Sequence, residues 1–472
     1  MNVSFLQELL NTIAEQGRQL LPRSLGGGEP KDDITELADA LVSVRGEASG
    51  VAIAREILNR YRALSDEERR SFLEFLAETL QPDPNGVTRA AKAYLANPSE
   101  ANVAALQRAV ESPRQEFFRR LNLAPGATAE IVAMRRDIMA GAAEDAALAR
   151  VDADLMHLLS SWFNRGFLVL RRIDWQTPAA ILEKIIAYEA VHEIRGWDDL
   201  RRRLDPADRR CFAFFHPSLI DEPLIFVEVA LTNAIPDNIN TVLEEAPKGD
   251  GLADKPTTAV FYSISNCQEG LRGISFGNFL IKQVVDDLVK ERASLKTFVT
   301  LSPVPRFAKW LEQTIGEADA DLVSPAERDR LRVLADPDWI DAPEAAEALK
   351  PVLLRLAAHY FLTAKAADGG PVDPVARFHL GNGARLERIN WLGDTSPKGL
   401  REAHGLMVNY RYEIRDIEKN HEAYENEGVV AVSRQVSALL KAERSRGEGG
   451  KLLLLPSLLT SRAALDKEEG TP

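Results

Sequence analysis

The chain has 472 residues, of which 45% are hydrophobic and 27% are charged, and its formal net charge is −13. This length exceeds one ordinary domain, so we expect two to four domains, each able to bury its own core. The acidic balance argues against a general nucleic-acid-binding protein, whose binding surface would be a basic domain. An anionic small molecule remains possible as a ligand, because a local basic cleft can form on an acidic protein.

Cysteine and histidine spacing gives no sign of a metal site. The two cysteines, Cys211 and Cys267, do not form a CxxC pair, and the seven histidines show no HExxH spacing. No apolar run approaches 18 residues, so we expect no membrane span. The start of the chain lacks the features of a signal peptide, and its end is not Ser-Lys-Leu. We therefore expect a cytoplasmic protein.

Residues 1–165 are predicted to form a helical domain. Apolar residues recur every three to four positions in several segments, which include 32–44, 50–64, 65–80 and 101–112. Several of these segments open on Ser, Asp or Asn, which are favourable N-cap residues. The region holds one histidine and no cluster of groups suited to chemistry, so a packing or oligomerisation role is the simplest interpretation.

The pattern changes after Trp162, and residues 166–472 are predicted to form an α+β domain. Five runs rich in β-branched and aromatic residues are bounded by turn residues, at 166–175, 209–217, 223–232, 257–265 and 296–303. A strongly amphipathic segment, 278–294, lies between the last two runs. This order of strand, helix and strand predicts a βαβ unit with parallel strands.

A glycine-rich turn precedes that amphipathic helix, in "SISNCQEGLRGISFGNFLIKQVV". Free amides and the positive end of the helix dipole make such a turn a ready phosphate site. The turn lacks the Gly-Lys-Ser/Thr ending of a Walker A loop. Its spacing of Arg272, Ser275 and Gly277 is similar to the coenzyme A pyrophosphate loop of the GNAT acyltransferase fold, with Ser in place of the first Gly. An ordinary glycine-bearing turn is the alternative.

Two further residues are candidates for chemistry. Ser302 precedes Pro303, which cannot donate to a strand ladder, so the strand is predicted to end there, where α/β sheets often place reactive groups. His379 stands in the apolar run "RFHLGNGARLERINW". By itself each has a simpler explanation, a turn-initiating serine and a core histidine.

Taken together, these segments resemble the malonyl-CoA decarboxylase family. The resemblance is carried by 216–232, 259–285, 300–311, 374–400 and 405–413, which occur in the family's order and span about residues 160–415. It implies a helical N-terminal domain, 1–165, followed by an α+β catalytic domain of GNAT acyltransferase type, 166–472. It also implies a carboxy-lyase that converts malonyl-CoA to acetyl-CoA and carbon dioxide in fatty-acid and malonate metabolism. A homo-oligomer, namely a tetramer, is implied as well.

The family's functional residues fall on matching positions of this chain. The catalytic pair falls on Ser302 and His379. The substrate-binding positions fall on Arg272, Gly273, Ile274, Ser275, Phe276, Gly277, Asn278, Ser263 and Tyr412. The chain departs from animal members of the family at Ser275, where those proteins carry Glu.

The reaction needs no cofactor, because the thioester carbonyl itself accepts the electron pair as an enolate when carbon dioxide leaves. Coenzyme A is part of the substrate, and Arg272 and Lys282 are candidates for its phosphates. We expect His379 to donate a proton to the enolate carbon and Ser302 to hold the malonyl carboxylate or to accept a proton, although these roles could be exchanged. The pair requires that the two side chains lie near hydrogen-bonding distance. An acyl-CoA-dependent acyltransferase and a non-enzymatic acyl-CoA sensor are the alternatives.

Overall fold

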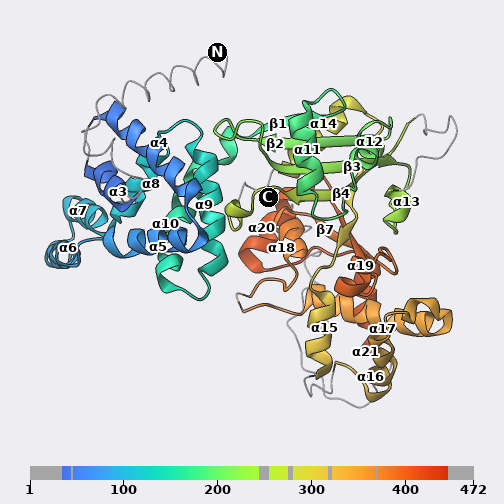
Figure 1. Ribbon diagram of the computed structural model, residues 1–472. Helices are drawn as coiled ribbons and strands as arrows, with labels where there is room; N and C mark the ends of the chain where they lie inside the picture. Colours follow the sequence, from blue (N-terminus) through green and yellow to red (C-terminus); the bar gives the residue numbers. More distant parts are fainter. Residues whose placement is uncertain are drawn as a thin grey trace, which may run out of the picture.

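The structure is a computed structural model that describes residues 34–43, 46–243, 255–274, 280–316, 322–367 and 369–444. The chain begins as a helical region and continues as a part built around one sheet, and the two lie side by side (Figure 1). The first 33 residues and residues 445–472 lie outside the described residues.

The helical region contains eight described helices: α3 (Ile34–Ser43), α4 (Glu47–Ala63), α5 (Asp66–Thr79), α6 (Pro84–Ala96), α7 (Glu100–Val110), α8 (Pro113–Leu121), α9 (Ala127–Gly141) and α10 (Ala146–Trp162). Helix α5 begins where the sequence predicts, because Ser65 and Glu68 form a capping box that satisfies the first amides. Leu73 and Leu76 of this helix are buried with Phe117 and Leu155 of its neighbours. These contacts bury the apolar face that the periodicity predicts.

The second part contains eight strands: β1 (Val169–Ile173), β2 (Arg209–Phe215), β3 (Pro223–Thr232), β4 (Thr258–Asn266), β5 (Thr297–Thr300), β6 (Ser302–Pro303), β7 (Arg385–Asn390) and β8 (Met407–Arg411). They form one sheet in the order β1-β2-β3-β4-β5-β8-β6, and β7 also pairs with β8. Most pairs are antiparallel, and β4 and β5 are parallel. Strand β3 is buried along nearly its whole length, which its mostly apolar sequence predicts, and its one charged side chain, Glu228, is buried as well.

Helix α14 (Leu280–Glu291) connects the parallel strands β4 and β5. It buries Leu280, Ile281, Val284, Val285 and Leu288, which share one face of the helix. The predicted βαβ unit is therefore confirmed.

The remaining described α-helices are α11 (Ala179–Tyr188), α12 (Trp197–Leu204), α13 (Asn240–Leu243), α15 (Phe307–Gly316), α16 (Pro325–Leu331), α17 (Pro343–Leu362), α18 (Pro374–Gly381), α19 (Pro397–Ala403), α20 (Ile417–Glu427) and α21 (Arg434–Arg444). Helices α15, α16, α17 and α21 gather in a lobe below the sheet (Figure 1). Among the described residues, no helix is both long enough and apolar enough to cross a membrane.

The strand predicted over 296–303 is interrupted at Leu301. Strand β5 pairs with β4 from Thr297 to Thr300, and the Leu301 amide then donates to the Phe261 carbonyl at 2.9 Å. On its other edge the chain pairs with β8, first at Val299 and again at Ser302, which lies opposite Val408. The chain therefore leaves β4 at this point, and Ser302 lies where the two parallel strands stop pairing.

The predicted fold class is confirmed: a helical N-terminal region precedes an α+β part with a mixed sheet and a parallel β4-α14-β5 unit. The division of the chain at residue 165 stays a prediction, since one hydrophobic core extends from α3 through the sheet to α21.

Candidate functional site

Ser302 and His379 lie next to each other in the folded chain, although 77 residues separate them in the sequence. The Ser302 Oγ and His379 Nε2 atoms are 3.2 Å apart, which is hydrogen-bonding distance. Both residues are buried, with 5% and 3% of their surfaces exposed. The geometric condition that the sequence sets for this pair is met.

The pair belongs to a longer chain of hydrogen bonds. The Tyr412 hydroxyl lies 2.8 Å from His379 Nδ1, so the ring has a partner on both nitrogens. Ser302 Oγ donates to Thr300 Oγ1 at 2.8 Å, and the Tyr410 amide donates to the same oxygen at 3.1 Å. Residues from β5, β6, α18 and the end of β8 thus orient the two central side chains.

His379 is held by a short helix with a strong N-terminal signal. Asp373 caps α18 by accepting from the amides of Val375 and Ala376, both at 2.9 Å, and Pro374 occupies the first turn. The imidazole stacks on the Tyr410 ring with centroids 4.6 Å apart. The cap, the stack and the two hydrogen bonds fix the position of the ring.

Burial makes the His379 imidazole neutral. Desolvation lowers its pKa from 6.5 to about 3, because the charged form loses its water. A neutral imidazole carries one N–H and one lone pair, so it donates to one of its two partners and accepts from the other. The site can therefore pass a proton between the hydroxyl groups of Ser302 and Tyr412.

The Gly-Asn-Gly turn after His379 requires glycine at its last position. Gly383 has a φ of +77°, and a Cβ atom there would lie 2.1 Å from the Ile417 carbonyl oxygen at the start of α20. The Ala384 amide next to it donates to the His379 carbonyl at 3.0 Å. The close packing of this turn on α20 thus supports the end of the helix that carries His379.

We expect Gly383→Ala to lower the free energy of unfolding by more than about 2 kcal/mol, because backbone strain adds to a clash with backbone. Thermal or urea unfolding measures the effect. Gly428→Ala is the matched control, since Gly428 has a φ of +65° and open space around the added Cβ. It should cost only about 1 kcal/mol. Equal losses in both variants would show that the contact with Ile417 has no importance.

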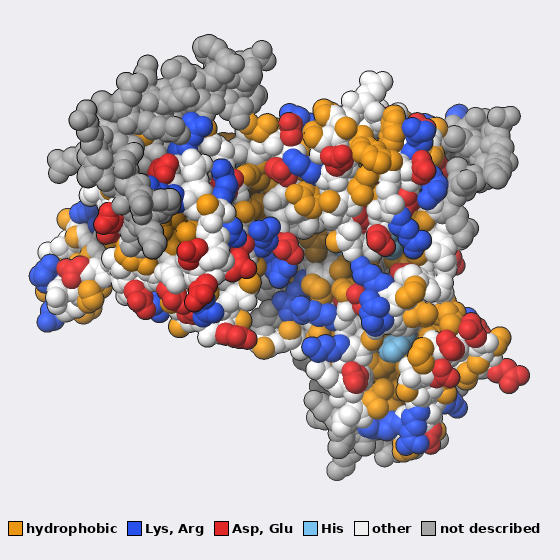
Figure 2. All heavy atoms as spheres, viewed as in Figure 1, with side chains coloured by type: hydrophobic (Ala, Val, Ile, Leu, Met, Phe, Trp, Pro, Cys, Tyr) orange, Lys and Arg blue, Asp and Glu red, His pale blue; other side chains and the backbone are white. Residues whose placement is uncertain are grey.

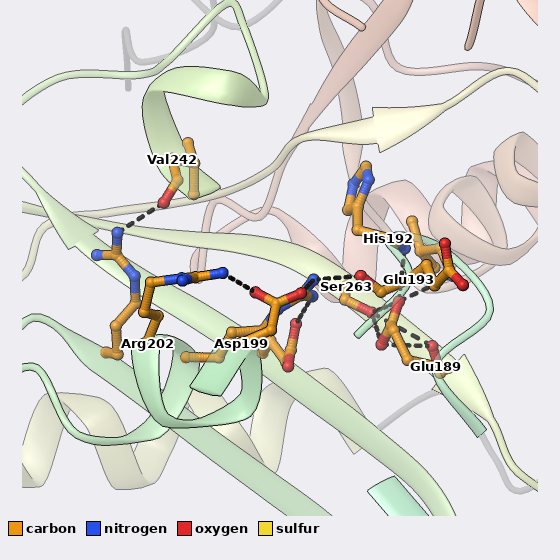
Figure 3. Close-up of polar contacts among 12 residues, drawn as sticks. Glu189, His192, Glu193, Asp199, Arg202, Val242 and Ser263 are labelled. Atoms are coloured by element: carbon orange, nitrogen blue, oxygen red, sulfur yellow. Dashed lines mark hydrogen bonds and ion pairs between the residues drawn. The ribbon is translucent and has the colours of Figure 1, made fainter. Parts of the chain in front are cut away.

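Ser263, a third predicted site residue, contacts a different polar cluster. Its hydroxyl donates to Glu189 at 2.7 Å, and Ser265 donates to the same carboxylate at 3.1 Å. The Glu189 carboxylate also accepts from the His192 amide at 2.7 Å (Figure 3). Ser263 lies on β4, whereas Ser302 lies on β6, beyond the point at which β4 and β5 stop pairing. The two serines therefore contact different polar groups.

The predicted substrate loop is described only in part. Arg272, Gly273 and Ile274 follow the short 3-10 helix η2 (Glu269–Leu271), and Gly273 has a φ of +83°. Ser275, Phe276, Gly277 and Asn278 lie outside the described residues. A cavity of about 360 Å³ lies beside this turn and is lined by Arg136, Asp137, Met139, Ala140, Glu269 and Arg272.

Basic side chains gather in the hollow between the helical region and the sheet-containing part (Figure 2). The acidic chain therefore presents a local basic surface, as the sequence analysis allows. Lys282, the other phosphate candidate, forms an ion pair with Glu418 at 3.0 Å.

The described residues contain no group of three or more His, Cys, Asp or Glu side chains suited to a metal ion. Cys211 and Cys267 are buried, and burial raises the pKa of both thiols above its usual value.

Thr300, Tyr410 and Glu189 contact predicted site residues but were missed in the sequence. For two of them a signal was available. Thr300 and Ser302 are two positions apart, as are Tyr410 and Tyr412, and residues at that spacing share one face of a strand. Glu189 precedes its partner Ser263 by 74 residues and shows no local pattern.

Comparison with known proteins gives consistent matches. The family model described as "Malonyl-CoA decarboxylase N-terminal domain" matches residues 80–163, and the one described as "Malonyl-CoA decarboxylase C-terminal domain" matches residues 166–449. A curated relative from Anser anser anser, "Malonyl-CoA decarboxylase, mitochondrial", is 37% identical over 81% of this chain and 82% of its own length. The relative from Mus musculus carries the same name and is 36% identical over 69% of this chain and 70% of its own length.

Crystal structures of two bacterial proteins are also similar. Malonyl-CoA decarboxylase from Rhodopseudomonas palustris is 53% identical, with a TM-score of 0.82 over 87% of this chain and 100% of that one. The protein of the same name from Agrobacterium vitis is 56% identical, with a TM-score of 0.82 over 86% of this chain and 99% of that one.

The names of the curated relatives contradict the prediction of a cytoplasmic location, since those relatives are named as mitochondrial proteins. By its sequence and its structure, the chain belongs to the malonyl-CoA decarboxylase family.

Proposed function

We propose that this protein is a carboxy-lyase that converts malonyl-CoA to acetyl-CoA and carbon dioxide, with Ser302 and His379 as its catalytic residues. The observation that carries the proposal is the buried contact of 3.2 Å between these two side chains, with Tyr412 on the other nitrogen of the imidazole. The relatives named above support the choice of substrate. We further propose that the site needs no metal or organic cofactor.

Substrate binding changes the charge state of His379 in this mechanism. Without a nearby anion, burial favours the neutral imidazole, because desolvation makes the charged form costly. A malonyl carboxylate in contact with the pair supplies that anion and raises the pKa of His379, so the ring takes up a proton as the substrate binds. The bound state then contains a carboxylate and an imidazolium in a dry site.

The carbon–carbon bond to the carboxylate then breaks. Its electron pair passes to the thioester, which becomes an enolate, and carbon dioxide leaves. The imidazolium delivers its proton to C2 of the enolate, which gives acetyl-CoA and regenerates neutral His379. A positioned acid of this kind contributes a factor of about 10² to 10⁴ in rate.

Ser302 orients the substrate in this scheme. Its hydroxyl donates to Thr300 in the free protein and can turn to donate to the malonyl carboxylate when the substrate is bound. Thr300 keeps its place because its oxygen accepts from the Tyr410 amide. We propose that Arg272 and the basic hollow bind the coenzyme A phosphates.

The direct test measures carbon dioxide and acetyl-CoA formed from malonyl-CoA by the purified protein after treatment with a chelator. We expect one acetyl-CoA for each carbon dioxide, with no loss of rate on chelation. A protein that binds malonyl-CoA but releases no carbon dioxide contradicts the proposal.

The tetramer remains a prediction, and light scattering of the same sample measures the mass of the oligomer.

Tyr412→Phe is expected to lower kcat about fivefold, because it removes the hydroxyl that lies 2.8 Å from His379 Nδ1 and keeps the ring. Tyr410→Phe is the matched control, since the Tyr410 hydroxyl is buried without a hydrogen-bond partner among the described residues. It should leave kcat unchanged, as its ring still stacks on His379. Steady-state kinetics measure both. If Tyr412→Phe and Tyr410→Phe had the same kcat, the Tyr412 hydroxyl would have no role in catalysis.

A further inference from the structure

Arg135 connects the helical region directly to the turn that carries Arg272. It lies on α9, its side chain is fully buried, and its Nη1 atom donates to the carbonyl of Gly270 at 2.7 Å and to the carbonyl of Arg272 at 3.0 Å. A buried guanidinium makes strong hydrogen bonds, because it is charged and shielded from water. The two bonds hold the backbone on both sides of Leu271.

Asp152 of α10 compensates the charge of this arginine. Its Oδ1 atom lies 2.8 Å from Arg135 Nε, and its side chain is 19% exposed. Two helices of the helical region therefore contribute to one contact with the turn, with α9 at the border of that region (Figure 1).

The turn also packs on α9 without room for a side chain. A Cβ atom at Gly270 would lie 1.9 Å from the Val132 carbonyl oxygen. The backbone of the turn thus touches the backbone of α9, which only glycine allows at this position. Arg136, the neighbour of Arg135, lines the cavity described above together with Arg272.

We propose that Arg135 is a positioning residue for the acyl-CoA site: the helical region, through Arg135 and Asp152, holds the Gly270–Arg272 turn so that it binds the coenzyme A part of the substrate. This inference rests on the proposed function. It gives the helical region a direct role in substrate binding, beyond packing and oligomer assembly.

The helical region offers a matched control in Arg114. Its side chain is 5% exposed, its Nε atom donates to Asp154 at 2.9 Å, and its Nη1 atom donates to the Ala77 carbonyl at 2.8 Å. The chemistry is the same as at Arg135, but every partner belongs to the helical region. A change at Arg114 therefore affects stability without reaching the turn.

The experiment compares Arg135→Met with Arg114→Met by thermal unfolding, by steady-state kinetics on malonyl-CoA and by calorimetric binding of acetyl-CoA. Both variants should lose stability. Only Arg135→Met should raise KM and weaken acetyl-CoA binding, each about tenfold, with kcat within about twofold of the wild type. Arg135→Lys keeps the charge and should give an intermediate KM.

Asp152→Asn and Asp154→Asn repeat the comparison with milder changes if a methionine variant does not fold. Only Asp152→Asn should then raise KM. The inference would be overturned if Arg135→Met or Asp152→Asn left KM and the affinity for acetyl-CoA unchanged. It would also be overturned if the control variants Arg114→Met or Asp154→Asn changed these quantities by the same factor. A wild-type protein that binds acetyl-CoA but does not decarboxylate malonyl-CoA would instead refute the proposed function, and the affinity comparison would still test the inference.

Discussion

His379→Asn and Ser302→Ala should each lower kcat by about 100-fold or more, with the folded state retained. His379→Asn removes the only group in the hydrogen-bonded chain that can give a proton to C2 near neutral pH. Ser302→Ala removes the hydroxyl that lies 3.2 Å from the imidazole. Initial rates of carbon dioxide release measure both effects.

The two residues act as a unit in the proposed mechanism, so their effects should not add. We expect the double variant to be about as slow as the slower single variant. His404→Asn is the matched control, because His404 is half-buried and has a left-handed φ of +50° that Asn tolerates well. Its ring faces Phe307, and kcat should stay near the wild-type value. Near-normal rates in both single variants would exclude the pair from catalysis.

Arg203→Met should lower the free energy of unfolding by about 3–5 kcal/mol at pH 8.5, the largest stability effect that we expect. Arg203 Nη1 lies 3.0 Å from Glu228 Oε2, and the Glu228 side chain is fully buried in the sheet. Removal of the arginine leaves a buried carboxylate without its cation. Urea unfolding measures the loss.

The loss should be smaller at pH 5.5. Burial raises the pKa of Glu228 to about 7 even beside Arg203, and removal of the cation raises it further. A carboxyl group whose pKa is raised by folding stabilises the folded state at low pH, and this contribution disappears as the pH rises through the folded pKa. At pH 5.5 the protonated Glu228 needs no cation.

Arg202→Met is the control for this prediction. Arg202 is 52% exposed and pairs with Asp199 at 3.1 Å (Figure 3), so its loss should cost no more than about 1 kcal/mol at either pH. A loss in Arg203→Met that is as small as this, or one that does not depend on pH, would contradict the assignment of a buried charge pair.

Local patterns in the sequence predict most of the sheet. The run 223–232 becomes β3 with the same bounds, because a strand buried on both faces is mostly apolar, although this one also buries Glu228. The amphipathic segment 278–294 contains α14, whose buried residues share one face. These elements could be predicted because the signal for each lies within the element itself.

The site itself depends on contacts that are remote in the sequence. Nothing near His379 indicates that its ring lies between Tyr410 and Ser302, and the helix that carries it, α18, has only 8 residues. The predicted strand is interrupted at Leu301, where pairing with β4 ends while pairing with β8 continues at Ser302. The pattern within one segment cannot show where a neighbouring strand stops pairing, and the same limit hides the contact between Arg135 and the Gly270–Arg272 turn.

In the proposed mechanism, Ser302 and His379 decarboxylate malonyl-CoA and deliver a proton to C2. Mass spectrometry of the product formed from malonyl-CoA in D₂O tests it most directly, with His379→Asn as the comparison. The wild type should form acetyl-CoA that carries one deuterium at C2 and keeps its thioester, and His379→Asn should form at least about 100-fold less of it in the same time. Three results would contradict this mechanism. The malonyl-CoA could remain unchanged, free coenzyme A could appear only with an added acceptor, or the wild type and His379→Asn could form equal amounts of product.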